Sequence, residues 1–102
     1  MIIVTGRAIT TSGSHARMLE ISTEHCARSR AEPGCLAHNV HIDCEDERRL
    51  VFVEYWESMA ALMAHFAVPE SRAFVEEMAK LSATPLEMRL FEATETRPDW
   101  DH

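Results

Sequence analysis

Five polar or aromatic side chains near the middle of the chain have the types and spacing needed for proton transfer on an aromatic molecule. Asn39 and His41 alternate in one segment, Glu54 and Trp56 alternate in the next, and His65 follows shortly after. Imidazole titrates near neutral pH, a carboxylate can orient it, and an indole ring can stack on an aromatic substrate. With an amide beside them, these groups would line a small cavity.

Two strands joined by a hairpin must position these side chains. Residues 35–43 alternate in polarity, residues 49–57 are rich in β-branched and aromatic side chains, and residues 44–48 form a charged connection. Alternate side chains of a strand share one face, and we expect the hairpin register to place both pairs on the same face. A short helix that begins after Ser58 would bring His65 over that face.

The rest of the chain supplies a regular series of further elements. We expect a strand at 2–10, a helix at 15–31, helical pieces at 59–66 and 71–81, and a last strand at 86–91. The first helix should stop at Glu32-Pro33-Gly34, because proline cannot continue a helix and glycine permits the turn.

The order β-α-β-β-α-α-β predicts an α+β fold. The arrangement with short right-handed connections is the ferredoxin-like split βαβ, a four-stranded antiparallel sheet with helices on one face. A chain of 102 residues is long enough for one domain. We place that domain at 1–94 and a polar C-terminal tail at 95–102.

The segment 50–56 is apolar at both parities, although one face of such a sheet should be open to water. Helices can cover only one face. The simplest cover for the other face is a second copy of the chain packed sheet to sheet, so we expect a homodimer.

Composition excludes several classes of protein. The formal charge is −7, with 10 Lys and Arg against 17 Asp and Glu, which disfavours nucleic acid and anionic membranes as partners. No apolar run is long enough to span a bilayer, and the first residues lack the pattern of a secretion signal. The expected location is therefore the cytoplasm.

Metal-binding patterns are weak. The three cysteines form no C-x-x-C pair, and we interpret them as reduced thiols: Cys26, Cys35 and Cys44. His38 and His41 would point to opposite faces of their strand and cannot chelate one ion together. His41 with Asp43 or Glu54 is the remaining combination, and no third ligand is evident, so we predict no metal site.

Each candidate residue also has a purely structural interpretation. Trp56 could fill the core or a dimer interface. Glu54, surrounded by apolar neighbours, could pair with Arg7 or Arg89. His65 could interact with the negative end of its helix dipole.

Several motifs in order resemble one protein family. They are Glu32-Pro33-Gly34-Cys35-Leu36, a strand pair that ends Glu54-Tyr55-Trp56, Ala61-Leu62-Met63-Ala64-His65, and a break at Pro69. The series resembles the antibiotic biosynthesis monooxygenase domain family, which includes small quinol monooxygenases. The matching pattern covers residues 32–81, and the first and last strands fit it in kind.

The resemblance implies a dimeric α/β barrel that oxygenates a quinol or a phenolic, polyketide-like aromatic with dioxygen and no cofactor. A deprotonated phenol can itself give an electron to dioxygen, so the protein must bind it, take a proton and exclude water. On this interpretation His65 is the base, Glu54 orients it or holds the substrate hydroxyl, and Asn39 donates a hydrogen bond to a developing oxyanion.

The same resemblance implies a substrate-binding set. Trp56 would form a wall against the aromatic ring, Phe66 would add to that lining, and His41 would contact the substrate or act as a second base.

Other activities stay open at this level. Haem-degrading relatives carry an asparagine on the first strand, where this chain has Thr5, Gly6 and Arg7. An isomerase of a small hydroxy-ketone metabolite and a non-enzymatic dimer that binds a small molecule are the alternatives.

Overall fold

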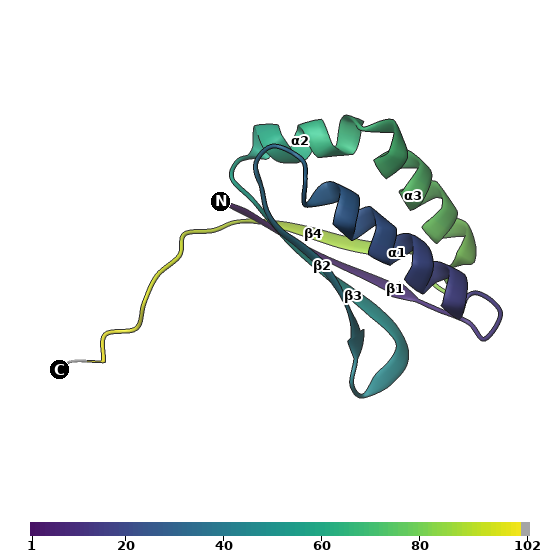
Figure 1. Cartoon of the computed structure of the whole chain (residues 1–102). Coiled ribbons are helices and arrows are strands. Elements are labelled where there is room, and N and C mark those ends of the chain that lie inside the picture. The colour runs from purple at the N-terminus through teal and green to yellow at the C-terminus, as the bar shows by residue number, and fades with distance from the viewer. Residues whose placement is uncertain (101–102) are drawn as a thin grey trace.

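The computed structural model describes residues 1–100, and within them the chain forms four strands and three helices (Figure 1). In chain order they are β1 Ile2–Ile9, α1 His15–Ser29, β2 Cys35–Asp43, β3 Asp46–Trp56, α2 Met59–Ala67, α3 Pro69–Leu81 and β4 Glu87–Glu92. This is the predicted order.

The strands form one antiparallel sheet with the order β2-β3-β1-β4, and all three helices lie on one face of it (Figure 1). The arrangement is the ferredoxin-like split βαβ, so the predicted fold class is confirmed. The central strands β1 and β3 pair over their whole common length, with Val4 opposite Glu54 and Gly6 opposite Phe52.

Local sequence signals explain where the elements begin and end. Gly34 adopts φ +82° in the turn after α1, a conformation that favours glycine. The Ser58 Oγ accepts a hydrogen bond from the Ala61 backbone N–H at 3.2 Å and caps α2. Pro69 is the first residue of α3, where its missing N–H costs nothing, and it separates α3 from α2.

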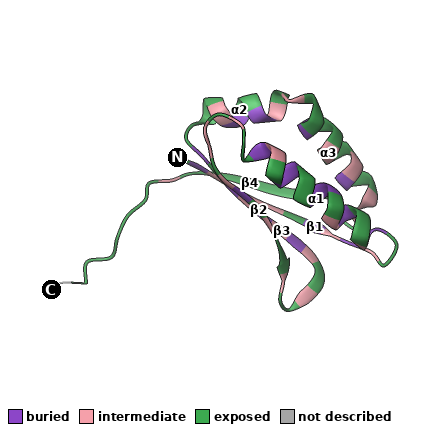
Figure 2. Ribbon diagram, viewed as in Figure 1, coloured by how far each residue is buried: buried purple, intermediate pink, exposed green. Residues whose placement is uncertain are grey.

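Two apolar clusters lie between the helices and the sheet, where Figure 2 shows the buried residues. The larger cluster is Ala8, Met18, Ile21, Cys26, Leu50, Phe52 and Met78. The smaller cluster is Ile2, Val4, Trp56 and Leu62, at the other end of the sheet. The candidate site lies beside the smaller cluster.

The opposite face of the sheet carries no helix among the described residues. Its side chains include Val51 and Val53, which are partly buried, and Tyr55 and Phe91, which are 38% and 47% exposed. A sheet face with these side chains is the feature from which the homodimer was predicted; the homodimer stays a prediction.

Residues 93–100 form no helix or strand and extend away from the sheet (Figure 1). Residues 95–100 of this stretch belong to the predicted polar tail at 95–102, whose last two residues, 101–102, lie outside the described residues. Within residues 1–100, no helix has the length and apolar character required to cross a membrane.

Candidate functional site

The hairpin register separates the residues that were expected to share a face. His38 pairs with Glu54 and Asn39 pairs with Val53, so Asn39 and His41 lie on the open face and are exposed. The prediction that both pairs share one face is therefore wrong. The reason is physical, because a shift of one residue in strand pairing moves every side chain to the other face.

Glu54, Trp56 and His65 do come together, under the helices. The Trp56 Nε1–H donates a hydrogen bond to Glu54 Oε1 at 2.9 Å, and the Trp56 and His65 rings lie 4.7 Å apart. Trp56 is fully buried and does not line the cavity described below. It therefore positions Glu54 and His65, which differs from the expected role as a wall against the substrate.

The carboxylate that orients His65 is Glu32. A hydrogen bond of 2.8 Å joins His65 Nδ1 to Glu32 Oε1, and a carboxylate can only accept. In the neutral form of the ring, the Nδ1 atom therefore carries the proton and Nε2 keeps a lone pair. This corrects the expectation that Glu54 orients His65. The role of Glu32 was missed because Glu32-Pro33-Gly34 also reads as the end of a helix.

Gly34 holds the Glu32 turn against the helix that carries His65. A Cβ atom at position 34 would lie 2.6 Å from the Ala61 Cβ, well inside van der Waals contact. The Gly34 carbonyl also accepts a hydrogen bond from the Glu57 backbone N–H at 2.9 Å. The turn therefore makes a backbone hydrogen bond to the segment that leads into α2, and Gly34 packs against the first turn of that helix.

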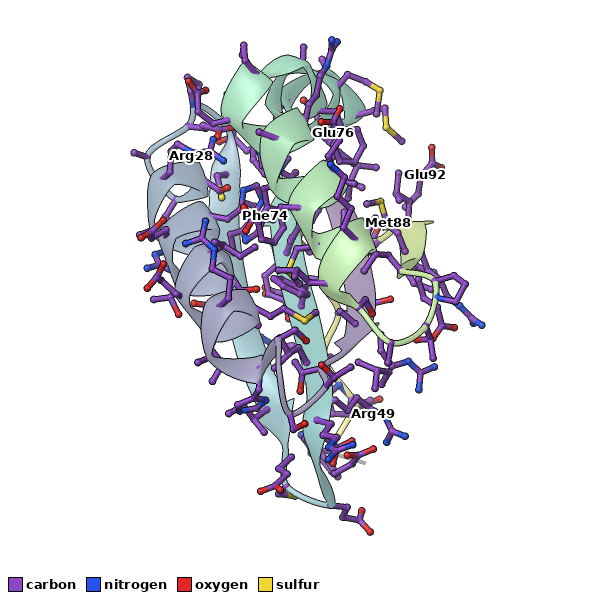
Figure 3. The ribbon with its side chains drawn as sticks, turned by 90° about the vertical axis from the view of Figure 1, so that its right-hand side faces the viewer. Arg28, Arg49, Phe74, Glu76, Met88 and Glu92 are labelled. Carbon is purple, nitrogen blue, oxygen red and sulfur yellow. The ribbon has the colours of Figure 1, made fainter. Side chains whose placement is uncertain are left out.

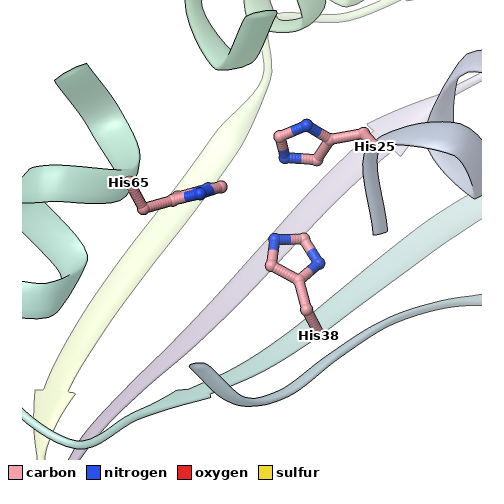
Figure 4. A group of neighbouring side chains, drawn as sticks. All are labelled: His25, His38 and His65. Carbon is pink, nitrogen blue, oxygen red and sulfur yellow. The ribbon is translucent and has the colours of Figure 1, made fainter. Parts of the chain in front are cut away.

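Two further histidines, His25 of α1 and His38 of β2, complete a cluster with His65 (Figure 4). The ring centroids lie 5.0 Å apart for His25 and His38, 5.3 Å for His25 and His65, and 5.4 Å for His38 and His65. All three are buried. We call this group the histidine cluster.

Arg28 fixes the tautomer of His25. Its NH2 group lies 2.7 Å from His25 Nδ1, and a guanidinium can only donate, so Nδ1 accepts and Nε2 carries the proton. Burial, followed by the nearby His38, His65 and Arg28, lowers the pKa of His25 to about 3, so the ring is neutral at pH 7. His25 and His65 thus have opposite tautomers, one with a donor Nε2 and one with an acceptor Nε2.

Glu54 is ionised although it is only 7% exposed. Burial raises its pKa, but the nearby His38 imidazole and the hydrogen bond from Trp56 outweigh burial and leave the pKa below its ordinary value. The nearest imidazole atom is His38 Nε2, 3.3 Å from Glu54 Oε1. Its alignment is not that of a hydrogen bond, and Nε2 is buried without any hydrogen-bond partner in the part of the chain that the structure describes.

The histidine cluster and Glu54 line one end of a cavity of about 570 Å³. Its other walls are mostly apolar and include Phe66, Phe74, Met78 and Met88. Figure 3 shows Phe74 on the α1 side of α3 and Met88 on the other side, at the β4 edge. The volume is suitable for a small aromatic molecule. Phe66 is among the lining residues, and its expected contact with a substrate stays a prediction.

Three imidazoles in contact are also a set of ligands that could hold a metal ion. One nitrogen from each ring lies within 4.8 Å of the other two. The prediction that the chain has no set of three potential metal ligands is therefore wrong. The cysteines offer little, because burial raises the pKa of Cys26 to about 12 and that of Cys35 above its ordinary value.

A sequence signal for the missed histidines exists in the periodicity. His25 continues the helical stripe of Met18, Ile21 and Ser22, all of which are buried. His38 shares its parity with Val40, which packs against the larger apolar cluster. A histidine on the apolar stripe of two different elements could have indicated a buried polar site.

A comparison with known protein families identifies the family of this chain. The family model for antibiotic biosynthesis monooxygenase (ABM) matches residues 1–77. The chain belongs to this family. The ABM match includes the elements that carry all three histidines, Glu32 and Glu54.

Solved structures of similar proteins show the same fold. A Deinococcus radiodurans protein, named as a candidate antibiotic biosynthesis monooxygenase, has a TM-score of 0.91 at 23% identity and covers 97% of this chain and 98% of its own. A structure named antibiotic biosynthesis monooxygenase has a TM-score of 0.85 at 25% identity, over 93% of this chain and 100% of its own.

A curated relative extends the similarity to a longer protein. The uncharacterized protein sll1783 of Synechocystis is 30% identical over 96 residues, which is 94% of this chain. The chain spans 65% of the length of that relative.

Proposed function

We propose that this ABM protein is a cofactor-independent monooxygenase that oxidises a small quinol or phenolic aromatic with dioxygen. The observation that carries the proposal is the pair of opposite tautomers, an acceptor Nε2 on His65 and a donor Nε2–H on His25, at the polar end of an apolar cavity. A phenol needs both a base and a donor at its oxygen as it becomes a phenolate.

The His65–Glu32 pair supplies the base. The Nε2 lone pair takes the phenol proton, and the Glu32 carboxylate, 2.8 Å from Nδ1, stabilises the imidazolium that results. His25 donates from its Nε2–H to the phenolate oxygen, and Arg28 holds it in that tautomer. Phe66, Phe74 and Met88 exclude water from the ring of the substrate.

Dioxygen then reacts with the electron-rich ring. The phenolate transfers an electron to dioxygen, and the two fragments join to form a C–O bond and a peroxide at the ring carbon. The O–O bond breaks with loss of the ring hydrogen as a proton. One oxygen atom stays as the second carbonyl of a quinone and the other leaves as water, so four electrons leave the substrate and four reduce dioxygen.

The same pair of imidazoles favours a second candidate, isomerisation of a small hydroxy-ketone. His65 would take the proton beside the carbonyl and His25 would stabilise the enolate oxygen. The two candidates differ in one measurement, because isomerisation exchanges a carbon-bound hydrogen with solvent and uses no dioxygen.

The direct test is dioxygen uptake by the chelator-treated chain with a panel of hydroquinones and naphthols. We expect uptake well above the spontaneous rate, without added flavin or metal, and one oxygen atom from labelled dioxygen in the quinone product. Uptake no faster than the spontaneous rate across the panel, together with solvent hydrogen exchange into hydroxy-ketones, would favour the isomerase instead. If neither dioxygen uptake nor hydrogen exchange is detected, the protein is best described as a non-enzymatic small-molecule-binding protein.

We also propose that two copies associate through the open sheet face. Val51, Val53, Tyr55 and Phe91 give this face an apolar centre, and pairing would bury side chains that a single chain exposes. Sedimentation equilibrium at micromolar concentration should give twice the chain mass. A Val53→Lys variant should sediment as one chain, and a wild-type chain that stays monomeric would contradict the proposal.

A further inference from the structure

We propose that the histidine cluster also binds one divalent first-row transition metal ion, with Glu54 as a fourth ligand. The inference goes beyond the proposed function and does not rest on it. It concerns a second use of the same ring nitrogens, and three geometric observations carry it: the spacing of the rings, an unpartnered nitrogen and a buried carboxyl group beside that nitrogen.

The spacing of the rings is close to that of a tetrahedral site. With metal–nitrogen bonds of roughly 2.0–2.1 Å, two ligand atoms of a tetrahedron lie about 3.3 Å apart. The three ring nitrogens lie within 4.8 Å of one another, so the widest pair must close by no more than about 1.5 Å, which small rotations of the rings can supply. Glu54 Oε1 and His38 Nε2 already lie 3.3 Å apart.

The Nε2 atoms of the three rings, which face the centre of the cluster, are the nitrogens that could coordinate a metal ion. The Nδ1 atoms all have outer partners, which are Arg28 for His25, Cys26 Sγ at 3.2 Å for His38, and Glu32 for His65. Figure 4 shows the three rings directed toward a common centre. His38 Nε2 is fully buried and lacks a hydrogen-bond partner among the described residues. A buried polar atom without a partner indicates a ligand that would satisfy it.

Charge favours a cation at this point. The Glu54 carboxyl group is buried, and its Oε1 accepts a hydrogen bond from the uncharged Trp56 indole. Glu32 adds a second carboxylate next to His65, and Arg28 supplies one positive charge beside His25. A dication between the rings would therefore face two carboxylates and one guanidinium, and would neutralise a buried anion that is otherwise costly.

Arg28 limits the affinity of the site. In the metal-free chain, His25 Nδ1 accepts a hydrogen bond from Arg28 NH2. Coordination of a metal through His25 Nε2 would move the ring proton to Nδ1, so that two donors would face each other. Arg28 must then turn toward Glu32 Oε2, which lies 3.5 Å from its NH1 group. Metal binding and the His25 tautomer of the metal-free chain are therefore mutually exclusive, and Arg28 favours the metal-free state.

The ligand set selects the class of ion. Three imidazoles and one carboxylate suit Zn²⁺, Cu²⁺, Ni²⁺ and Co²⁺, whereas Mg²⁺ and Ca²⁺ require oxygen ligands. A bound ion occupies the lone pair of His65 that the proposed reaction uses as its base. Saturating Zn²⁺, which has no redox chemistry, should therefore stop dioxygen uptake in the assay described above.

The test uses the untagged, chelator-treated chain without any substrate. Titration with Co²⁺ should give the intense visible bands of a four-coordinate ion at one ion per chain, with a Kd tighter than about 10 µM. The electron paramagnetic resonance spectrum of the Cu²⁺ form should show coupling to three imidazole nitrogens. This measurement needs no variant, so a misfolded mutant cannot obscure it.

Two variants on accessible side chains sharpen the result. His41→Ala, on the open face, should leave the Co²⁺ affinity within about twofold of wild type. Arg28→Gln removes a positive charge and offers an amide oxygen to His25 Nδ1–H, so it should tighten binding roughly three- to tenfold.

Four outcomes would overturn the inference: Co²⁺ bands of a six-coordinate surface complex, fewer than three coupled nitrogens, a loss of Co²⁺ affinity in His41→Ala well beyond about twofold, or weaker Co²⁺ binding in Arg28→Gln. Absence of metal binding with dioxygen uptake intact would remove this inference alone. Binding without dioxygen uptake or hydrogen exchange would remove the proposed function alone.

Discussion

The two ends of the helix-covered sheet face differ sharply in what they bury. One end packs Met18, Leu50, Phe52 and Met78 into an apolar cluster without a charged side chain. The other end buries the histidine cluster and the Glu54 carboxylate beside Trp56. Helices α1 and α3 cover the apolar end, whereas α2 packs on the smaller cluster at the polar end. The two ends therefore differ both in their residues and in the helices above them.

The two ends of the sheet face contribute to stability in different ways. Apolar burial stabilises by about 25 cal/mol per Å² and needs no partner, whereas each buried polar group must find one. The polar end meets this demand with a chain of contacts from His25 through Arg28 and Glu32 to His65. We infer that the apolar end supplies stability and that the polar end is retained for binding and proton transfer.

The largest expected effect is the loss of the base. His65→Ala should lower turnover of the best quinol about 10²–10⁴-fold, because no other described side chain combines a free ring acceptor with a carboxylate partner. Stopped-flow or electrode rates measure the loss, and circular dichroism checks that the fold is retained. Unchanged turnover in a folded variant would remove His65 from the role.

The apolar end should respond in the opposite way. Leu50→Ala leaves a cavity at a fully buried position and should reduce the free energy of unfolding by about 2–5 kcal/mol. Turnover below the melting temperature should stay within about twofold of wild type. Urea unfolding and the oxygen electrode measure the two quantities, and a large loss of turnover would show that the ends are not separable.

Trp56→Phe tests the support beneath the polar end. The variant keeps an aromatic ring but removes the Nε1–H that donates to Glu54 at 2.9 Å. A buried carboxylate that loses a donor should cost about 1–3 kcal/mol of unfolding free energy. If Trp56 contacted the substrate instead, the KM would rise and the stability would hardly change.

Glu32→Gln is a milder change to the base. Glutamine can still accept from His65 Nδ1–H, but the bond loses its charge assistance, so turnover should fall about tenfold. As a positioning residue, Glu32 should affect kcat with little change in KM. A change confined to KM would mean that Glu32 binds substrate and does not act through His65.

His41→Ala should have the smallest effect. The side chain lies on the open face, away from the cavity, so the turnover rate and the KM for the quinol should stay within about twofold of wild type. A matched loss in this variant and in His65→Ala would contradict the placement of the site on the helix-covered face.

The fold was largely predictable from the sequence because its signals are local. Alternation marks β2, the Pro33-Gly34 pair ends α1, and Ser58 begins α2, and each of these signals acts within a few residues. The order of the elements then leaves few topologies with short connections.

The site was predictable only in part because it depends on register and on tertiary contact. Asn39 and His38 are neighbours in sequence, and the pairing of His38 with Glu54 alone decides that the imidazole is buried and the amide exposed. Glu32 and His65 meet through the packing of a turn on α2, which no local pattern reports. His65, Glu54 and Phe66, which the sequence pattern indicated, all line the cavity, and their roles there stay predictions.

The absence of a side chain at position 34 ties sequence variation in the turn to events in the cavity. Any larger residue there would push the first turn of α2 outward, and the His65 ring would travel with its backbone. Gly34→Ala would thus misplace His65 for the proposed proton transfer, although position 34 lies outside the cavity. The tolerance of this turn to mutation would then depend on the geometry of the reaction as well as on folding.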